Sequence, residues 1–164
     1  MAKTRKTVNE RNSIKKWKYR KLLIVYGIFV ILITICRKPQ AITNSKLYWD
    51  YIERNIQLIP LRSIQDLGRV IFDDTFSVNA RVLSAINIIG NIFIMVPFGL
   101  FLPNVSEKMN RLRYFLLFTI GGILLIEMLQ LFGTIGAFDI DDIILNVIGA
   151  LLGFKYPAGQ RKVQ

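Results

Sequence analysis

The stretch DIDDIILNVIGALLG, residues 139–153, places three aspartates directly before an apolar segment that carries one asparagine and two glycines. A helix advances 100° per residue, so the polar and glycine positions of this stretch fall on one face about 80° wide. This face consists of Asp139, Asp142, Asn146, Gly149 and Gly153, whereas Asp141 points the other way. Because lipid offers no partner to a polar side chain, we expect the polar face to meet other helices inside a membrane bundle.

Two interpretations of this face follow from the residue types. In the first, the side chains only hold helices together, because Gly149 and Gly153 let a neighbouring backbone approach closely. The same glycines are also the expected contact if the chain forms a homo-oligomer. In the second, the aspartates and the asparagine line a functional site. Both interpretations fit the stretch taken by itself.

The composition indicates a membrane protein. The chain has 164 residues, of which 52% are hydrophobic, and it contains no histidine, which excludes histidine-based catalytic and metal sites. The single Cys36 cannot form an internal disulfide, and its apolar surroundings do not favour a nucleophilic thiol. The formal net charge is +11, but nine of the 22 basic residues precede the first apolar run at residue 22. Such clustering is typical of a cytoplasmic flank beside a lipid bilayer, and we expect no nucleic-acid partner.

We predict an all-α fold, a polytopic membrane protein with a bundle of four transmembrane helices. A secretory signal peptide is the alternative for the first apolar run, but bulky and charged residues follow it where a cleavage site needs small ones. The expected organisation is a basic tail at 1–21, a first span at 22–36, an outer connection at 37–81, a three-span core at 82–156 with spans at 82–102, 114–132 and 140–156, and a tail at 157–164.

Proline positions refine this outline. The apolar segment NIQLIPLRSI, residues 55–64, is interrupted by Pro60 and is too short to span a bilayer, so we expect a re-entrant or interfacial piece. Pro97 is expected to kink or loosen the second span, and Pro103 to end it.

The charge distribution predicts the orientation. Fifteen of the 22 basic residues lie in the two tails, in the loop at 104–113 and at Lys155 beside the second tail, whereas eight of the 11 acidic residues lie in the connection at 37–81 and at 139–142. The positive-inside rule therefore predicts a multi-pass protein of the plasma membrane with both termini in the cytoplasm.

This orientation brings polar side chains from three spans to the outer half of the bundle. The second span contributes two asparagines near Gly90, the third contributes a carboxylate and an amide, and the fourth contributes its polar face. We predict an outward-facing polar cavity lined by Asn87, Asn91, Glu127, Gln130, Asp139, Asp142 and Asn146. The nearest counter-charges are Arg62, Arg69 and Arg81, and Arg62 is favoured because it lies in the apolar piece that contains Pro60.

The chain resembles the VanZ-like family. The resemblance covers roughly residues 55–155 and depends on NIIGNIFIMVPFGLFLP at 87–103, Glu127-x-x-Gln130 and DIDDIILNVIGALLG, with NIQLIPLRSI as a further likeness. Many members carry an arginine shortly before the aspartates, where this chain has Gly136-Ala137-Phe138. The founding member is a small membrane protein that lowers susceptibility to teicoplanin. The resemblance therefore implies a cell-envelope protein of a Gram-positive bacterium.

Two classes of function agree with these observations. The favoured one is a non-enzymatic protein that lowers susceptibility to lipoglycopeptides, with the lipid bilayer and a lipoglycopeptide or wall-precursor lipid as partners. The alternative is an enzyme acting on a lipid-linked wall precursor, in which Glu127 acts as acid or base and a divalent cation binds Asp139, Asp141 and Asp142. The sequence suggests no other cofactor. A small transporter that uses Glu127 as a proton relay is a third, less favoured class.

Overall fold

A computed structural model describes residues 2–35, 39–42 and 44–158, with side chains at 13–33, 39–42 and 44–154. The described part is built from six α-helices, one 3-10 helix and two very short strands. In chain order these are α1 (Ala2–Ile35), α2 (Ser45–Arg54), β1 (Ile56–Gln57), α3 (Arg62–Phe72), α4 (Val78–Val105), η1 (Glu107–Asn110), α5 (Leu112–Phe132), β2 (Phe138–Asp139) and α6 (Ile140–Ala158).

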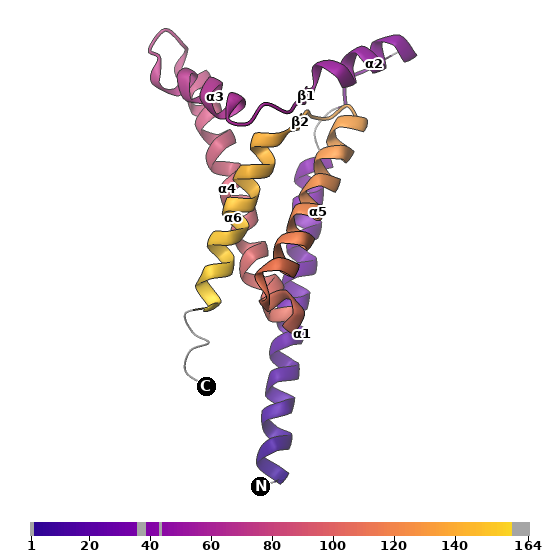
Figure 1. Ribbon diagram of the computed structural model, residues 1–164, viewed down its shortest axis with the longest axis vertical. Coiled ribbons are helices and arrows are strands. Elements are labelled where there is room, and N and C mark those ends of the chain that lie inside the picture. Colours follow the sequence, from indigo (N-terminus) through magenta and orange to yellow (C-terminus); the bar gives the residue numbers. More distant parts are fainter. Residues whose placement is uncertain (1, 36–38, 43, 159–164) are drawn as a thin grey trace.

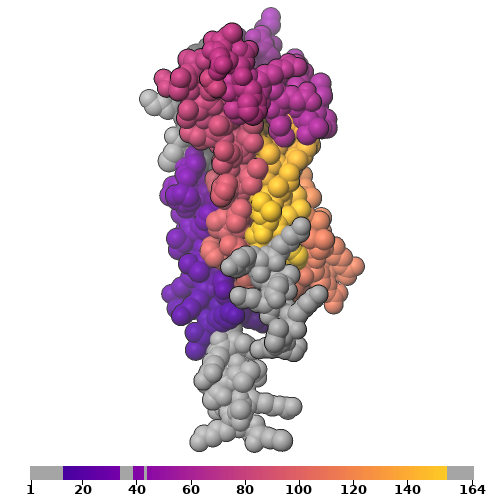
Figure 2. All heavy atoms as spheres, turned by 90° about the vertical axis from the view of Figure 1, so that its left-hand side faces the viewer, coloured from indigo at the N-terminus to yellow at the C-terminus, as the bar shows by residue number. Residues whose placement is uncertain are grey.

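The long helices α1, α4, α5 and α6 run along the molecule, while α2 and α3 spread outward at one end (Figure 1). Helix α4 is central because it packs on α6, α1 and α3, and α5 packs mainly on α6 and η1. The start of α1 and the end of α6 lie at the end opposite to α2 and α3. The space-filling view shows α3 and the following turn lying across the ends of α4 and α6 (Figure 2).

The predominantly helical fold expected from the sequence is confirmed. Within the described residues, α4 (28 residues) and α5 (21 residues) are long and apolar enough to cross a membrane, judged by length and composition. Helix α1 continues from the basic segment into the first apolar run without a break, since residues 2–26 contain neither glycine nor proline. The predicted end of the first span at Cys36 lies outside the described residues.

The prediction that Pro103 ends the second span is wrong, because α4 continues to Val105. The missing N–H of Pro103 removes only the hydrogen bond to the carbonyl of Gly99, and the two residues that follow it stay helical. The side chain of Asn104 donates to the carbonyl of Leu100 at 2.7 Å and satisfies part of this turn. Pro97 lies within the same helix.

Helices α4 and α6 contact each other backbone to backbone. A Cβ atom placed on Gly149 would lie 1.9 Å from the carbonyl oxygen of Ile92, and one on Gly153 would lie 2.1 Å from that of Val96. Both distances are far below van der Waals contact, so the two glycines are sterically required. The adjoining hydrophobic core consists of Met95, Leu102, Phe115, Ile123, Ile143 and Ala150.

The glycine contact yields a first prediction. We expect Gly149→Ala to lower the free energy of unfolding by at least about 1–3 kcal/mol, because the added methyl group collides with backbone that cannot move independently. Gly90→Ala is the matched control in α4, since a Cβ there meets nothing within 4 Å. Alanine should even favour that helix by up to about 1 kcal/mol. Denaturant unfolding in detergent micelles measures both, and equal effects would contradict this assignment.

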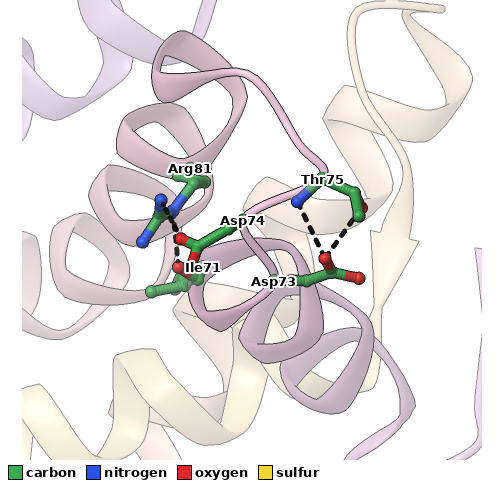
Figure 3. A network of polar contacts seen from close by, with 5 residues as sticks. All are labelled: Ile71, Asp73, Asp74, Thr75 and Arg81. Atoms are coloured by element: carbon green, nitrogen blue, oxygen red, sulfur yellow. Dashed lines mark hydrogen bonds and ion pairs between the residues drawn. The ribbon is translucent and has the colours of Figure 1, made fainter.

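The turn between α3 and α4 is fixed by two carboxylates (Figure 3). The Oδ1 atom of Asp73 accepts from the hydroxyl of Thr75 at 2.7 Å and from its backbone N–H at 2.9 Å. Arg81 donates from Nη1 to Asp74 at 2.7 Å and from Nε to the carbonyl of Ile71 at 2.8 Å. The hydroxyl of Thr75, followed by its N–H, holds the pKa of Asp73 below its usual value because both favour the ionised form.

A second prediction concerns this carboxylate. Thr75→Val removes the hydroxyl, so the pKa of Asp73 should rise toward its ordinary value, whereas Thr75→Ser should leave it low. Because the folded-state pKa is the lower one, the turn gains stability above the unfolded pKa of about 3.9 and loses it as the pH falls through the folded value. An NMR titration of the Asp73 carboxyl carbon measures the shift, and an unchanged value in Thr75→Val would exclude the hydroxyl as its main cause.

Candidate functional site

A polar pocket of about 380 Å³ lies at the end of the molecule where α2 and α3 are found. Helix α3 provides one wall, and α4, α5 and the start of α6 provide the others. The lining residues are Ser63, Asp66, Leu67, Asn87, Asn91, Glu127, Gln130, Ala137, Asp139 and Asp142. Six of the eight residues predicted from the sequence for this cavity, Arg62 included, therefore surround one pocket.

The two asparagines of α4 face α6. Asn87 and Asn91 are one helical turn apart, and the Nδ2 atom of Asn91 lies 3.5 Å from the Oδ1 atom of Asn87. The same Nδ2 atom donates a short hydrogen bond to the carboxylate of Asp142. This contact depends on the close packing of the two helices, because Gly149 meets Ile92 on the same faces.

Helix α5 contributes the most buried group of the pocket. Glu127 has only 4% of its surface exposed, although it lines the pocket, and Gln130 lies half-buried nearly one turn later. The backbone carbonyl of Gln130 accepts from the N–H groups of Ile135 and Gly136 at 3.0 and 3.1 Å. These bonds close a tight turn that leads the chain from α5 back to Asp139.

The short strand pair positions Asp139. Strands β1 and β2 are parallel, with Ile56 opposite Phe138 and Gln57 opposite Asp139. The hydroxyl of Tyr51 in α2 donates to the carbonyl of Gly136 at 2.7 Å and holds the same turn. One oxygen of Asp139 accepts from the backbone N–H of Asp141 at 2.8 Å, so this carboxylate also stabilises the first turn of α6.

Asp141 serves α3 instead of the pocket. Its carboxylate accepts from the backbone N–H of Leu61 at 2.5 Å and from that of Ile64 at 3.1 Å. These donors belong to the N-terminus of α3, where the helix dipole favours a negative charge. Leu61 adopts a left-handed φ of 67°, which is unfavourable for leucine, and its hydrogen bond to Asp141 helps to hold this backbone conformation. Asp141, 1% exposed, therefore anchors α3 over the pocket.

The structure does not bring every predicted residue to the pocket. Asn146 is buried, but its Nδ2 atom donates to the backbone carbonyl of Asp142 at 2.8 Å within α6. Arg62 is exposed and is not a lining residue. Arg69 pairs with Asp66 at 3.4 Å and Arg81 pairs with Asp74 at 2.7 Å, so both are engaged on the surface.

The three aspartates at the start of α6 do not form a metal-binding cluster. Among the described residues, no group of three or more histidine, cysteine, aspartate and glutamate side chains is arranged to hold a metal ion. The physical reason is that neighbouring residues of a helix point in different directions. Asp139 and Asp142 line the pocket, whereas the carboxylate of Asp141 binds the N-terminus of α3.

Four lining residues escaped the sequence analysis: Ser63, Asp66, Leu67 and Ala137. A signal for Ser63 and Asp66 was present, since these polar residues are three positions apart on an amphipathic helix that also carries Ile64 and Ile71. No signal marked Ala137, which depends on the path of a turn.

The electrostatic character of the pocket follows from its lining. Four carboxylates (Asp66, Glu127, Asp139 and Asp142) and three side-chain amides line it, and no lining residue is basic, although Asp66 is paired with Arg69 beside the pocket. Such a surface accepts hydrogen bonds and attracts positive charge. It is chemically suited to a ligand with ammonium or amide N–H groups and unsuited to one recognised by its phosphate.

A third prediction tests the anchor of α3. Asp141→Ala leaves the N–H groups of Leu61 and Ile64 without their acceptor, which costs about 1–3 kcal/mol in a buried setting. We expect hydrogen exchange of the α3 amides to accelerate by at least about tenfold, while exchange in α5 stays unchanged. Asp74→Ala is the control, since it removes an exposed carboxylate at the other end of α3. Equal acceleration in both variants would contradict the anchoring role of Asp141.

A family model described as VanZ/LLP1 matches residues 23–156. The match confirms the resemblance found in the sequence and extends it from about residue 55 back to residue 23. No curated protein and no solved structure matches the chain.

Proposed function

The chain belongs to the VanZ/LLP1 family, and we propose on this premise that it is a four-span protein of the bacterial plasma membrane with both termini in the cytoplasm. Its outward-facing polar pocket lowers susceptibility to lipoglycopeptide antibiotics such as teicoplanin. The spans are the apolar part of α1 and the helices α4, α5 and α6. Two of these, α4 and α5, have the length and apolar composition to cross a membrane, and the positive-inside rule supports the orientation.

One observation carries the functional part of the proposal. Three helices that are distant in sequence deliver Asn91, Glu127 and Asp142 to the same pocket, although each helix is otherwise strongly apolar. Polar groups at such positions are costly in a membrane and mark functional sites by default. In the proposed orientation the pocket lies toward the outer leaflet, where lipid-linked wall precursors and lipoglycopeptides are found.

The chemistry of the pocket suggests how it acts. Its carboxylates and amide oxygens accept hydrogen bonds from ammonium and amide N–H groups, which peptide-containing wall precursors and glycopeptides present. The protein would therefore engage either the antibiotic or its target at the membrane surface and reduce productive binding between them.

The alternative function is an enzyme acting on a lipid-linked wall precursor. It is favoured by the presence of Glu127, Asp139 and Asp142 around one pocket, since carboxylates can act as general acid and general base. Asp142 already accepts from Asn91, and Asp139 from the backbone of Asp141. These bonds support a binding role over a catalytic one.

A fourth prediction tests the pocket in cells. In a strain lacking the protein, the wild-type chain should raise the teicoplanin concentration needed for inhibition and leave that of vancomycin unchanged. Glu127→Gln and Asp142→Asn should each abolish this shift, because they remove the charge at nearly constant shape, and Asp74→Asn should retain it. Protein levels in the membrane are measured in parallel. Full activity of both pocket variants would refute the proposal, whereas turnover of a labelled precursor that depends on Asp142 would establish the enzymatic alternative.

A further inference from the structure

A second pocket lies at the opposite end of the molecule from the first. Its volume is about 210 Å³, and it is formed where α1 passes the end of α4 and the 3-10 helix η1. The lining residues are Lys15, Lys16, Pro103, Asn104, Ser106, Glu107 and Asn110. None of these residues belongs to the polar pocket under α3, and the proposed function does not use them.

The lining of this pocket is rich in hydrogen-bond donors. Two lysines, two asparagines and one serine present donor groups, and Glu107 is the one acid among the seven lining residues. Lys16 donates to Oε1 of Glu107 at 2.8 Å, so the charge of this acid is compensated. The lining thus keeps one net positive charge, supplied by Lys15, next to neutral donors.

The surroundings strengthen the positive character. Within residues 13–21, helix α1 carries five basic residues and no acid, and the residues that follow η1 add Arg111, which caps α5, and Arg113 in the first turn of α5. A small anion that enters the pocket therefore meets a positive potential from both sides.

The pocket lies at the level of a membrane surface in the proposed topology. The exposed apolar part of α1 begins at Leu22, seven residues or about 10 Å along the helix from Lys15. Between them lies Trp17, 57% exposed, with the ammonium of Lys21 at 3.6 Å from its ring centre. An aromatic ring with an adjacent lysine is typical of the interface between headgroups and hydrocarbon.

We propose that this inner pocket binds a phosphate group, with Lys15 as the charged contact and Asn104, Ser106 and Asn110 as neutral donors. The phosphate belongs either to an anionic lipid of the cytoplasmic leaflet or to free inorganic phosphate. A small volume, several donor side chains and one more lysine than acid in the lining match a single phosphate group better than a larger ligand. The site is independent of the outer pocket and of antibiotic susceptibility.

A fifth prediction tests this site with the full chain reconstituted in vesicles of phosphatidylcholine with or without phosphatidylglycerol. Native mass spectrometry of the released protein counts retained lipid. Lys15→Gln should lower retention of phosphatidylglycerol about tenfold or more, because it removes a charge-assisted hydrogen bond. Lys18→Gln is the matched control on the same helix. It should lower retention by no more than about fivefold, the effect of one lysine near an anionic surface.

A variant that is expected to bind more lipid provides a control, because misfolding cannot explain a gain of binding. Glu107→Gln removes the one lining acid and releases Lys16, so it should increase retention severalfold, at little cost to stability because the ion pair is exposed. Calorimetry with inorganic phosphate on the detergent-purified protein distinguishes the two sources. Lys15-dependent binding of inorganic phosphate indicates a site for the free ion, and retention of phosphatidylglycerol alone indicates a lipid site. Equal losses in Lys15→Gln and Lys18→Gln, or no gain in Glu107→Gln, would overturn the proposal.

Discussion

The backbone contact between α4 and α6 is the constraint on which the rest of the structure depends. Gly149 and Gly153 have no side chains, so the carbonyls of Ile92 and Val96 approach α6 more closely than any larger residue permits. A membrane bundle gains little from the hydrophobic effect between helices, and close packing of this kind is its main source of cohesion. The contact also brings Asn91 to Asp142, and it thereby forms one corner of the outer pocket.

The outer pocket needs a second constraint, which is the anchoring of α3. This helix has no buried residue of its own, and its strongly amphipathic sequence would not hold it in place. The carboxylate of Asp141 binds its N-terminal N–H groups, and the helix itself packs on α4. Together with the strand pair β1–β2, these contacts place Ser63 and Asp66 over the polar residues of the bundle.

The two pockets differ in charge in the way that their proposed places in the membrane require. The outer one is lined by four carboxylates and no basic residue, and the inner one by two lysines and one compensated acid. The difference follows the charge distribution of the chain, in which basic residues gather in the tails and the loop at 104–113 and acidic residues at 37–81 and 139–142. The two proposed ligands, one with N–H groups and one with a phosphate, are therefore matched to linings of opposite charge.

The sequence by itself indicated the long apolar segments and the polar positions on them, because hydrophobicity is a local property that each segment carries alone. It did not indicate the helices α2 and α3, which lie within the predicted connection at 37–81. It indicated that Asn91, Glu127 and Asp142 lie close together, since the few polar side chains on apolar helices need polar partners. Only the tertiary structure decided that Asp141 binds backbone 80 residues away, that Arg62 stays outside the pocket, and that Ser63 and Asp66 enter it. These outcomes depend on how far α3 is drawn toward α6. That distance is set by contacts between segments far apart in the sequence. The hydrophobic pattern of neither helix contains information about it.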